Sequence, residues 1–194
     1  MVLQALEAAQ WIRLTSCAAD LTIYAGDFNS EPTDVPFNIL RQVGGLEDSW
    51  AVVNGSKEGG GTCGTPYNTY TTSKEKKEAP AGKRIDYILY TSGPKIQVSA
   101  VECKLPLPQR IPVSINYKQL SYSDHEGVAA VLKIENNQGK SGEQKRQSSE
   151  REQCLERATA LVKNAVEASR KDKFIFLIIS IFCLVCFLLT FSGT

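Results

Sequence analysis

The chain has 194 residues, a formal net charge of +1, one histidine and six cysteines. This length allows one ordinary domain with additional segments, and the nearly balanced charge argues against nucleic acid as the main partner and against disorder. The cysteines have neither the density of a disulfide scaffold nor the spacing of a zinc finger, which fits a reducing compartment.

Helical and strand patterns alternate along the first 134 residues. In chain order we expect a helix at residues 2–19, a strand at 21–25, a helix that opens between 30 and 36 and stops at 44–45, and a short helix or turn at 46–53. Further strands are expected at 68–72, 84–90, 96–103 and 127–134, with a charged surface loop at 73–82. This alternation predicts an α/β (α+β) fold.

The sequence changes character after residue 134. Residues 135–150 are polar and predict a flexible linker, and residues 151–173 have the spacing of an amphipathic juxtamembrane helix. Residues 174–191 carry no charge and match the roughly 30 Å hydrocarbon core of a bilayer, so we expect a transmembrane helix there, with a buried core helix as the alternative. Basic residues precede this segment and none follows it, which predicts that the part of the chain before residue 174 faces the cytosol; the organelle is left open.

Polar groups suited to proton transfer occur in three separate loops. His125 is the only histidine, and its unperturbed pKa makes it a natural proton-transfer group. Asp27 and Asn29 follow one predicted strand, and Asp86 lies in another. Water attack on a phosphodiester needs a base, a carboxylate that orients the base, and a divalent ion. These residue types can act as the base, orient it and bind the ion.

Each of these residues also has a plain structural interpretation. His125 could be a surface histidine in a polar loop, and Asp27 and Asn29 could simply form a turn. Asp86 could form a salt bridge with Arg84 or with a lysine at the edge of a sheet. The order of the three motifs is more specific than any one of them.

That order resembles the exonuclease–endonuclease–phosphatase superfamily, which includes the DNase I-like enzymes. The matching motifs are GDFN at residues 26–29, RIDY at 84–87 and SDH at 123–125, and the resemblance covers about residues 3–134. Within the superfamily the chain is most similar to the membrane-anchored neutral sphingomyelinases of animals, through residues 26–32, 45–50, 82–90 and 121–127. The resemblance implies part of a four-layer α/β sandwich of the DNase I-like type.

The resemblance also implies a role for each matching residue. His125 would be the general base that activates water, and Asp86 would hold its imidazole. Asp27 would position the nucleophile or assist proton transfer, and Asn29 would contact the phosphate. Asp124 would lie beside Mg²⁺, directly or through water.

The implied reaction is the magnesium-dependent hydrolysis of sphingomyelin to ceramide and phosphocholine, with a membrane lipid and the bilayer as partners and no nucleic acid. The main metal-binding Glu of the family lies in an earlier half of the domain. We therefore expect residues 1–134 to be the C-terminal part of the catalytic domain, and this form to be incomplete and inactive by itself. Two alternatives stay open: another phosphodiesterase or phosphatase of the superfamily, or a catalytically silent membrane-anchored fragment.

Overall fold

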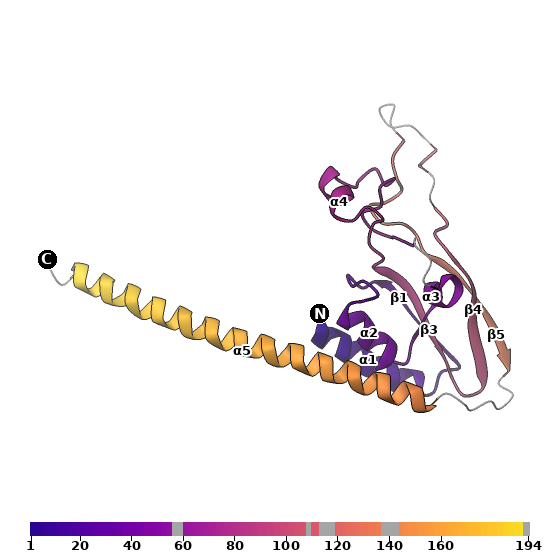
Figure 1. The fold of residues 1–194 in the computed structure, drawn as a ribbon, viewed down its shortest axis with the longest axis horizontal. Coiled ribbons are helices and arrows are strands. Elements are labelled where there is room, and N and C mark those ends of the chain that lie inside the picture. Colours follow the sequence, from indigo (N-terminus) through magenta and orange to yellow (C-terminus); the bar gives the residue numbers. More distant parts are fainter. Residues whose placement is uncertain (56–59, 108–109, 113–118, 137–143, 192–194) are drawn as a thin grey trace. The chain divides into compact units, whose positions relative to one another are not determined.

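A computed structural model describes residues 1–55, 60–107, 110–112, 119–136 and 144–191 (Figure 1). Of residues 144–148 and 188–191 it describes the backbone alone. The chain divides into two compact units, residues 1–154 and 155–194, and each is considered by itself. In chain order the elements are α1 (Val2–Ser16), β1 (Leu21–Asp27), α2 (Val35–Gln42), β2 (Glu47–Asp48), α3 (Ser49–Asn54), α4 (Ser73–Glu78), β3 (Asp86–Ser92), β4 (Ile96–Lys104), β5 (Ala129–Asn136) and α5 (Gln144–Phe191).

The strands of the first unit form two antiparallel sheets. One sheet has three strands in the order β1-β3-β2, and the other pairs β4 with β5. The register of the first sheet runs from Leu21 opposite Ser92 to Asp27 opposite Asp86. The mixed α/β fold expected from the sequence is therefore confirmed, and the end of β1 lies beside the start of β3.

An aromatic cluster joins α2 to β3 beneath that end of the sheet. Phe37 on α2 is fully buried, and its ring centroid lies 4.3 Å from that of Tyr87 on β3. The Tyr87 hydroxyl lies within hydrogen-bond distance of two backbone carbonyls, those of Ser30 at 2.7 Å and Arg84 at 2.6 Å, which share its single proton. The same tyrosine thus fixes the turn after β1 and the segment that leads into β3.

Tyr90 connects the two sheets. Its hydroxyl donates to Glu47 at 3.0 Å and accepts the backbone N–H of Ala100 at 3.0 Å, while the side chain packs with Val98 and Ala100. Burial is the main reason that the pKa of Tyr90 rises to about 12. A buried, neutral hydroxyl that makes two hydrogen bonds holds β3 and β4 at a fixed distance from each other.

Two segments differ from the sequence-based expectations. Residues 68–72, expected as a strand, form turns, because their polar groups bond to one another and to the later loop rather than to a neighbouring strand. Residues 73–78, expected as part of a charged loop, form α4. Thr72 and Glu75 make a reciprocal capping box at its start, which the charge pattern concealed.

The second unit is helical, and α5 runs without a break to Phe191. Residues 151–173 are helical as expected, and their juxtamembrane role stays a prediction. Both β5 and α5 extend into the ends of the expected linker, whose residues 137–143 lie outside the described part of the chain.

The transmembrane helix expected at residues 174–191 is not found: among the described residues, no helix is long and apolar enough to cross a membrane. The charged residues 170–173 precede this segment directly. Residues 188–191 lie outside the part with described side chains.

Candidate active site

Asp27 and Asp86 are brought together by strand pairing. Asp27 ends β1, Asp86 begins β3, and the antiparallel register places the two residues opposite each other. The pairing continues one step further, since the N–H of Phe28 donates to the carbonyl of Ile85 at 2.8 Å. The positions of both carboxylates therefore follow from the sheet itself and not from loop conformation.

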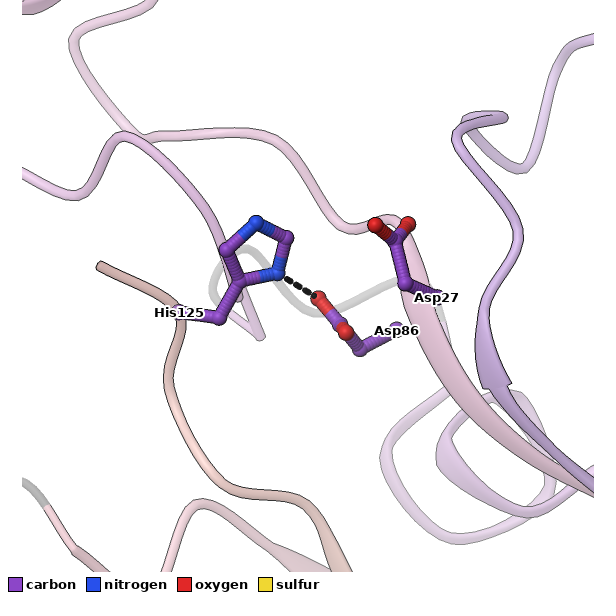
Figure 2. A group of neighbouring side chains, drawn as sticks. All are labelled: Asp27, Asp86 and His125. Atoms are coloured by element: carbon purple, nitrogen blue, oxygen red, sulfur yellow. Dashed lines mark hydrogen bonds and ion pairs between the residues drawn. The ribbon is translucent and has the colours of Figure 1, made fainter. Parts of the chain in front are cut away.

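His125 joins this pair through Asp86. Its Nδ1 lies 2.8 Å from Oδ2 of Asp86, and the two side chains are 28% and 19% exposed (Figure 2). An ionised carboxylate can only accept, so Nδ1 carries the proton in this bond. The other ring nitrogen, Nε2, lies on the side of the ring away from Asp86 and is left as the acceptor.

The loop that carries His125 is held by the segment between α3 and α4. Cys63 forms isolated antiparallel bridges with both Lys83 and His125. The carboxylate of Glu126 accepts from Thr65 at 2.9 Å and from Asn68 at 3.1 Å. Glu126 thus holds the loop in place through these two hydrogen bonds. Its role is structural, although it lies next to His125 in the sequence.

The electrostatic field of the site favours the imidazolium form. Partial burial opposes the charge on His125, but the hydrogen bond to Asp86 and the negative charges of Asp86, Asp27 and Asp124 outweigh it and raise the pKa. The pKa of the neighbouring Cys63 thiol is also raised, first by burial and then by Asp124 and Asp86. A raised thiol pKa argues against Cys63 as a nucleophile at neutral pH.

Asn29 is bound to Asp27 at two points. Its backbone N–H donates to Oδ1 of Asp27 at 2.8 Å, and its side-chain amide donates to Oδ2 at 3.1 Å. Asn29 adopts a φ of 48°, a left-handed conformation that asparagine tolerates better than most residues. The turn after β1 therefore orients the carboxylate of Asp27, and the expected contact of Asn29 with phosphate stays a prediction.

Asp27, Asp86 and His125 form a cluster in which one ligand atom from each lies within 4.8 Å of the others. Asp124, the metal ligand expected from the sequence, is not a member of this cluster; it is exposed and accepts from the Ser123 hydroxyl at 3.1 Å. Mg²⁺ prefers oxygen ligands and usually keeps several waters. The exposed carboxylates of Asp27 and Asp124 suit such an ion better than the partly buried dyad does.

Two features of the site were missed in the sequence. Thr62, fully buried, bonds to the backbone of Asp86, and nothing in its glycine-rich surroundings marks it out. Arg84 pairs at 2.8 Å with Asp48, whose side chain is 1% exposed, and so does not form the alternative salt bridge with Asp86. A buried carboxylate without an obvious partner in sequence gives no signal before the fold is known.

A mixed α/β fold that carries a carboxylate–histidine pair and a second carboxylate at one end of a sheet defines a hydrolase-type site. Residues 2–125 match the Endonuclease/Exonuclease/phosphatase family, which is most of the chain. The chain therefore belongs to this family, and the matched region contains Asp27, Asn29, Asp86 and His125.

Individual relatives are about a third identical to this chain over the residues that align. A Caenorhabditis elegans protein named "Putative neutral sphingomyelinase" is 34% identical over 199 residues, covering 95% of this chain and 44% of that protein. A Drosophila melanogaster protein of the same name is 34% identical over 133 residues, covering 69% and 28%. The human "Sphingomyelin phosphodiesterase 2" is 35% identical over 136 residues, covering 68% and 30%. The chain spans less than half the length of each of these relatives.

Proposed function

We propose that this chain carries the general-base half of a magnesium-dependent neutral sphingomyelinase, which hydrolyses sphingomyelin to ceramide and phosphocholine. The observation that carries the proposal is the 2.8 Å pair of His125 and Asp86 beside Asp27. The names of the relatives support this choice of substrate. The four-layer sandwich of the DNase I-like enzymes is the architecture that we propose for the complete domain.

In the proposed reaction the Nε2 of His125 takes a proton from water, and the water oxygen attacks phosphorus. The bond between phosphorus and the ceramide oxygen breaks, that oxygen takes a proton from solvent water and leaves as ceramide, and His125 then returns its proton to solvent. Asp86 holds the ring in the Nδ1–H form and stabilises the imidazolium that forms. Asp27, oriented by Asn29, lies near enough to His125 to hold the attacking water.

Mg²⁺ would be held by Asp27 or Asp124 together with water and would neutralise the phosphoryl oxygens when bound. Both carboxylates are exposed, which leaves room for those waters. A titration with MgCl₂ tests this: we expect the backbone amide signals around both residues to shift, and expect Asp124→Asn to weaken the effect. Equal binding by the Asp124→Asn variant would move the ion to other residues.

A hollow lined in part by Cys63 and Asp124, next to the loop that carries His125, favours a substrate with a cationic headgroup. Its volume is about 410 Å³, and its lining includes the half-exposed ring of Tyr70 with the carboxylates of Glu75 and Asp124. The pKa of Glu75 is lowered, chiefly by hydrogen bonds from Thr72, so this carboxylate stays ionised. Aromatic faces and carboxylates attract quaternary ammonium groups, whereas the same negative field repels the additional phosphates of nucleic acid or phosphoinositide.

The deciding experiment compares hydrolysis of sphingomyelin, single-stranded DNA and a phosphoinositide by the complete enzyme that contains this chain, with His125→Ala as the blank, because the chain by itself is expected to be inactive. Release of phosphocholine above the blank is expected. Turnover of DNA or phosphoinositide alone would favour another phosphodiesterase of the family, and turnover of none would favour the catalytically silent alternative. The expected cytosolic orientation stays a prediction.

A further inference from the structure

Thr62 makes contacts with both segments that carry the dyad. It lies between α3 and α4 and is 1% exposed. Its hydroxyl oxygen accepts the backbone N–H of Ile85 at 3.1 Å and that of Asp86 at 3.1 Å. One buried hydroxyl therefore satisfies two consecutive backbone donors at the first residue of β3.

The backbone of Thr62 reaches the other segment. Its carbonyl accepts the N–H of Glu126 at 2.6 Å, directly after His125, and its own N–H donates to Lys83 at 2.8 Å. Cys63, the next residue, forms isolated antiparallel β-bridges with both His125 and Lys83. Thr62 is thus bonded on one side to the strand that begins with Asp86 and on the other to the loop that presents His125.

We propose that Thr62 is a positioning residue that sets the separation of His125 and Asp86. The two partners are 39 residues apart in the sequence, and their side chains meet at 2.8 Å. Such a bond weakens steeply once the heavy atoms separate beyond about 3.2 Å, so a displacement on the order of 0.5 Å in either segment would break it. The inference concerns this geometry and does not depend on the identity of the substrate.

The residue type fits this role. A hydroxyl has two lone pairs and one proton, and here it accepts twice and points its proton towards the Lys83 carbonyl at 3.4 Å. Valine has the same shape without an acceptor and would leave the N–H groups of Ile85 and Asp86 without this partner. Serine keeps the acceptor and loses only a methyl group.

The test exploits the single histidine of the chain. Full-length protein labelled with ¹⁵N-histidine gives one pair of imidazole signals, which report the tautomer at a pH above the His125 pKa. The wild type is expected to hold the Nδ1–H form, because Asp86 accepts that proton. Thr62→Val is expected to lose this preference and to exchange the Asp86 amide on the order of tenfold faster, while Thr62→Ser retains both properties.

Tyr90→Phe is the matched control. Tyr90 is as buried as Thr62, and its hydroxyl likewise accepts a backbone N–H, that of Ala100 at 3.0 Å, instead of the N–H of Asp86. A comparable loss of stability with the Nδ1–H form retained is expected, which separates positioning from general destabilisation.

Three results would overturn the inference: a folded Thr62→Val protein with the Nδ1–H form intact, a Thr62→Ser protein without it, or a Tyr90→Phe protein that loses it equally. Should circular dichroism show that Thr62→Val does not fold, Thr62→Cys decides under reducing conditions. Its thiol is only a weak acceptor, so partial loss of the Nδ1–H form is expected and full retention contradicts the role.

Discussion

Asp27 and Asp86 lie directly opposite each other at the end of the β1–β3 pair. Like charges in this relationship repel. Asp86 is compensated by His125, and Asp27 by hydrogen bonds from Asn29. The sheet therefore creates a local excess of negative charge, which an imidazolium at His125 or a metal ion relieves.

In the complete enzyme that contains this chain, replacing His125 by alanine should lower phosphodiester hydrolysis by about 10²–10⁴-fold, the usual cost of removing a general base. The side chain is partly exposed and packs little, so the fold should persist. The measurement is product release combined with circular dichroism. Lys133→Ala, in an exposed ion pair on β5, serves as the control that keeps activity. A His125→Ala protein with most of its turnover would place the base elsewhere.

The pKa of His125 should lie above about 6.5 and fall when Asp86 is replaced by asparagine. The NMR titration of the single imidazole measures both values. Asp27→Asn should lower the pKa less, because Asp27 acts through charge alone whereas Asp86 also accepts a hydrogen bond. An Asp27→Asn effect larger than that of Asp86→Asn would contradict this ranking.

Stability should follow the same titration. Since the pKa is raised in the folded state, the imidazolium contributes stability that is fully present below the unfolded pKa of about 6.5 and is lost as the pH rises through the folded-state pKa. Urea unfolding across that window should show this component in the wild type and not in His125→Gln. The same pH slope in both proteins would show that His125 is not its source.

Much of the site could be predicted from the sequence, because Asp27, Asp86 and His125 lie in short motifs next to strands. What could not be predicted depends on contacts between distant segments. The antiparallel register that sets Asp27 against Asp86 is a property of strand pairing, and Thr62 acquires its contacts only when three segments meet. Capping likewise made a helix of residues 73–78, which charge alone suggested was a loop.

Breaking the buried pair of Arg84 and Asp48 should be strongly destabilising. Asp48 is 1% exposed, accepts from Arg84 at 2.8 Å and also caps α3 by accepting the N–H of Trp50. Arg84→Ala leaves this carboxylate buried without its cation, which typically costs about 3–5 kcal/mol. Lys133→Ala removes the exposed partner of Glu135 and should cost no more than about 1 kcal/mol. Urea unfolding measures both costs. Similar losses in the two variants would contradict the strong stabilisation expected from the Arg84–Asp48 pair.

Glu126 should prove to be a structural residue despite its place beside His125. Its Oε1 accepts from Thr65 at 2.9 Å and from Asn68 at 3.1 Å, and both of those donors are buried. Glutamine keeps an acceptor oxygen at that position, whereas alanine removes the acceptor of the Thr65 hydroxyl and leaves the Asn68 amide with only the Ser123 carbonyl at 2.9 Å, and a buried donor that loses its partner costs about 1–3 kcal/mol.

We therefore expect Glu126→Gln to retain most of its stability and turnover and Glu126→Ala to lose both, measured by urea unfolding and product release. A Glu126→Gln protein that is fully folded with its Nδ1–H imidazole in place, yet inactive, would instead require the negative charge of Glu126 in the reaction, and the carboxylate would then belong with Asp27 and Asp86 in the site.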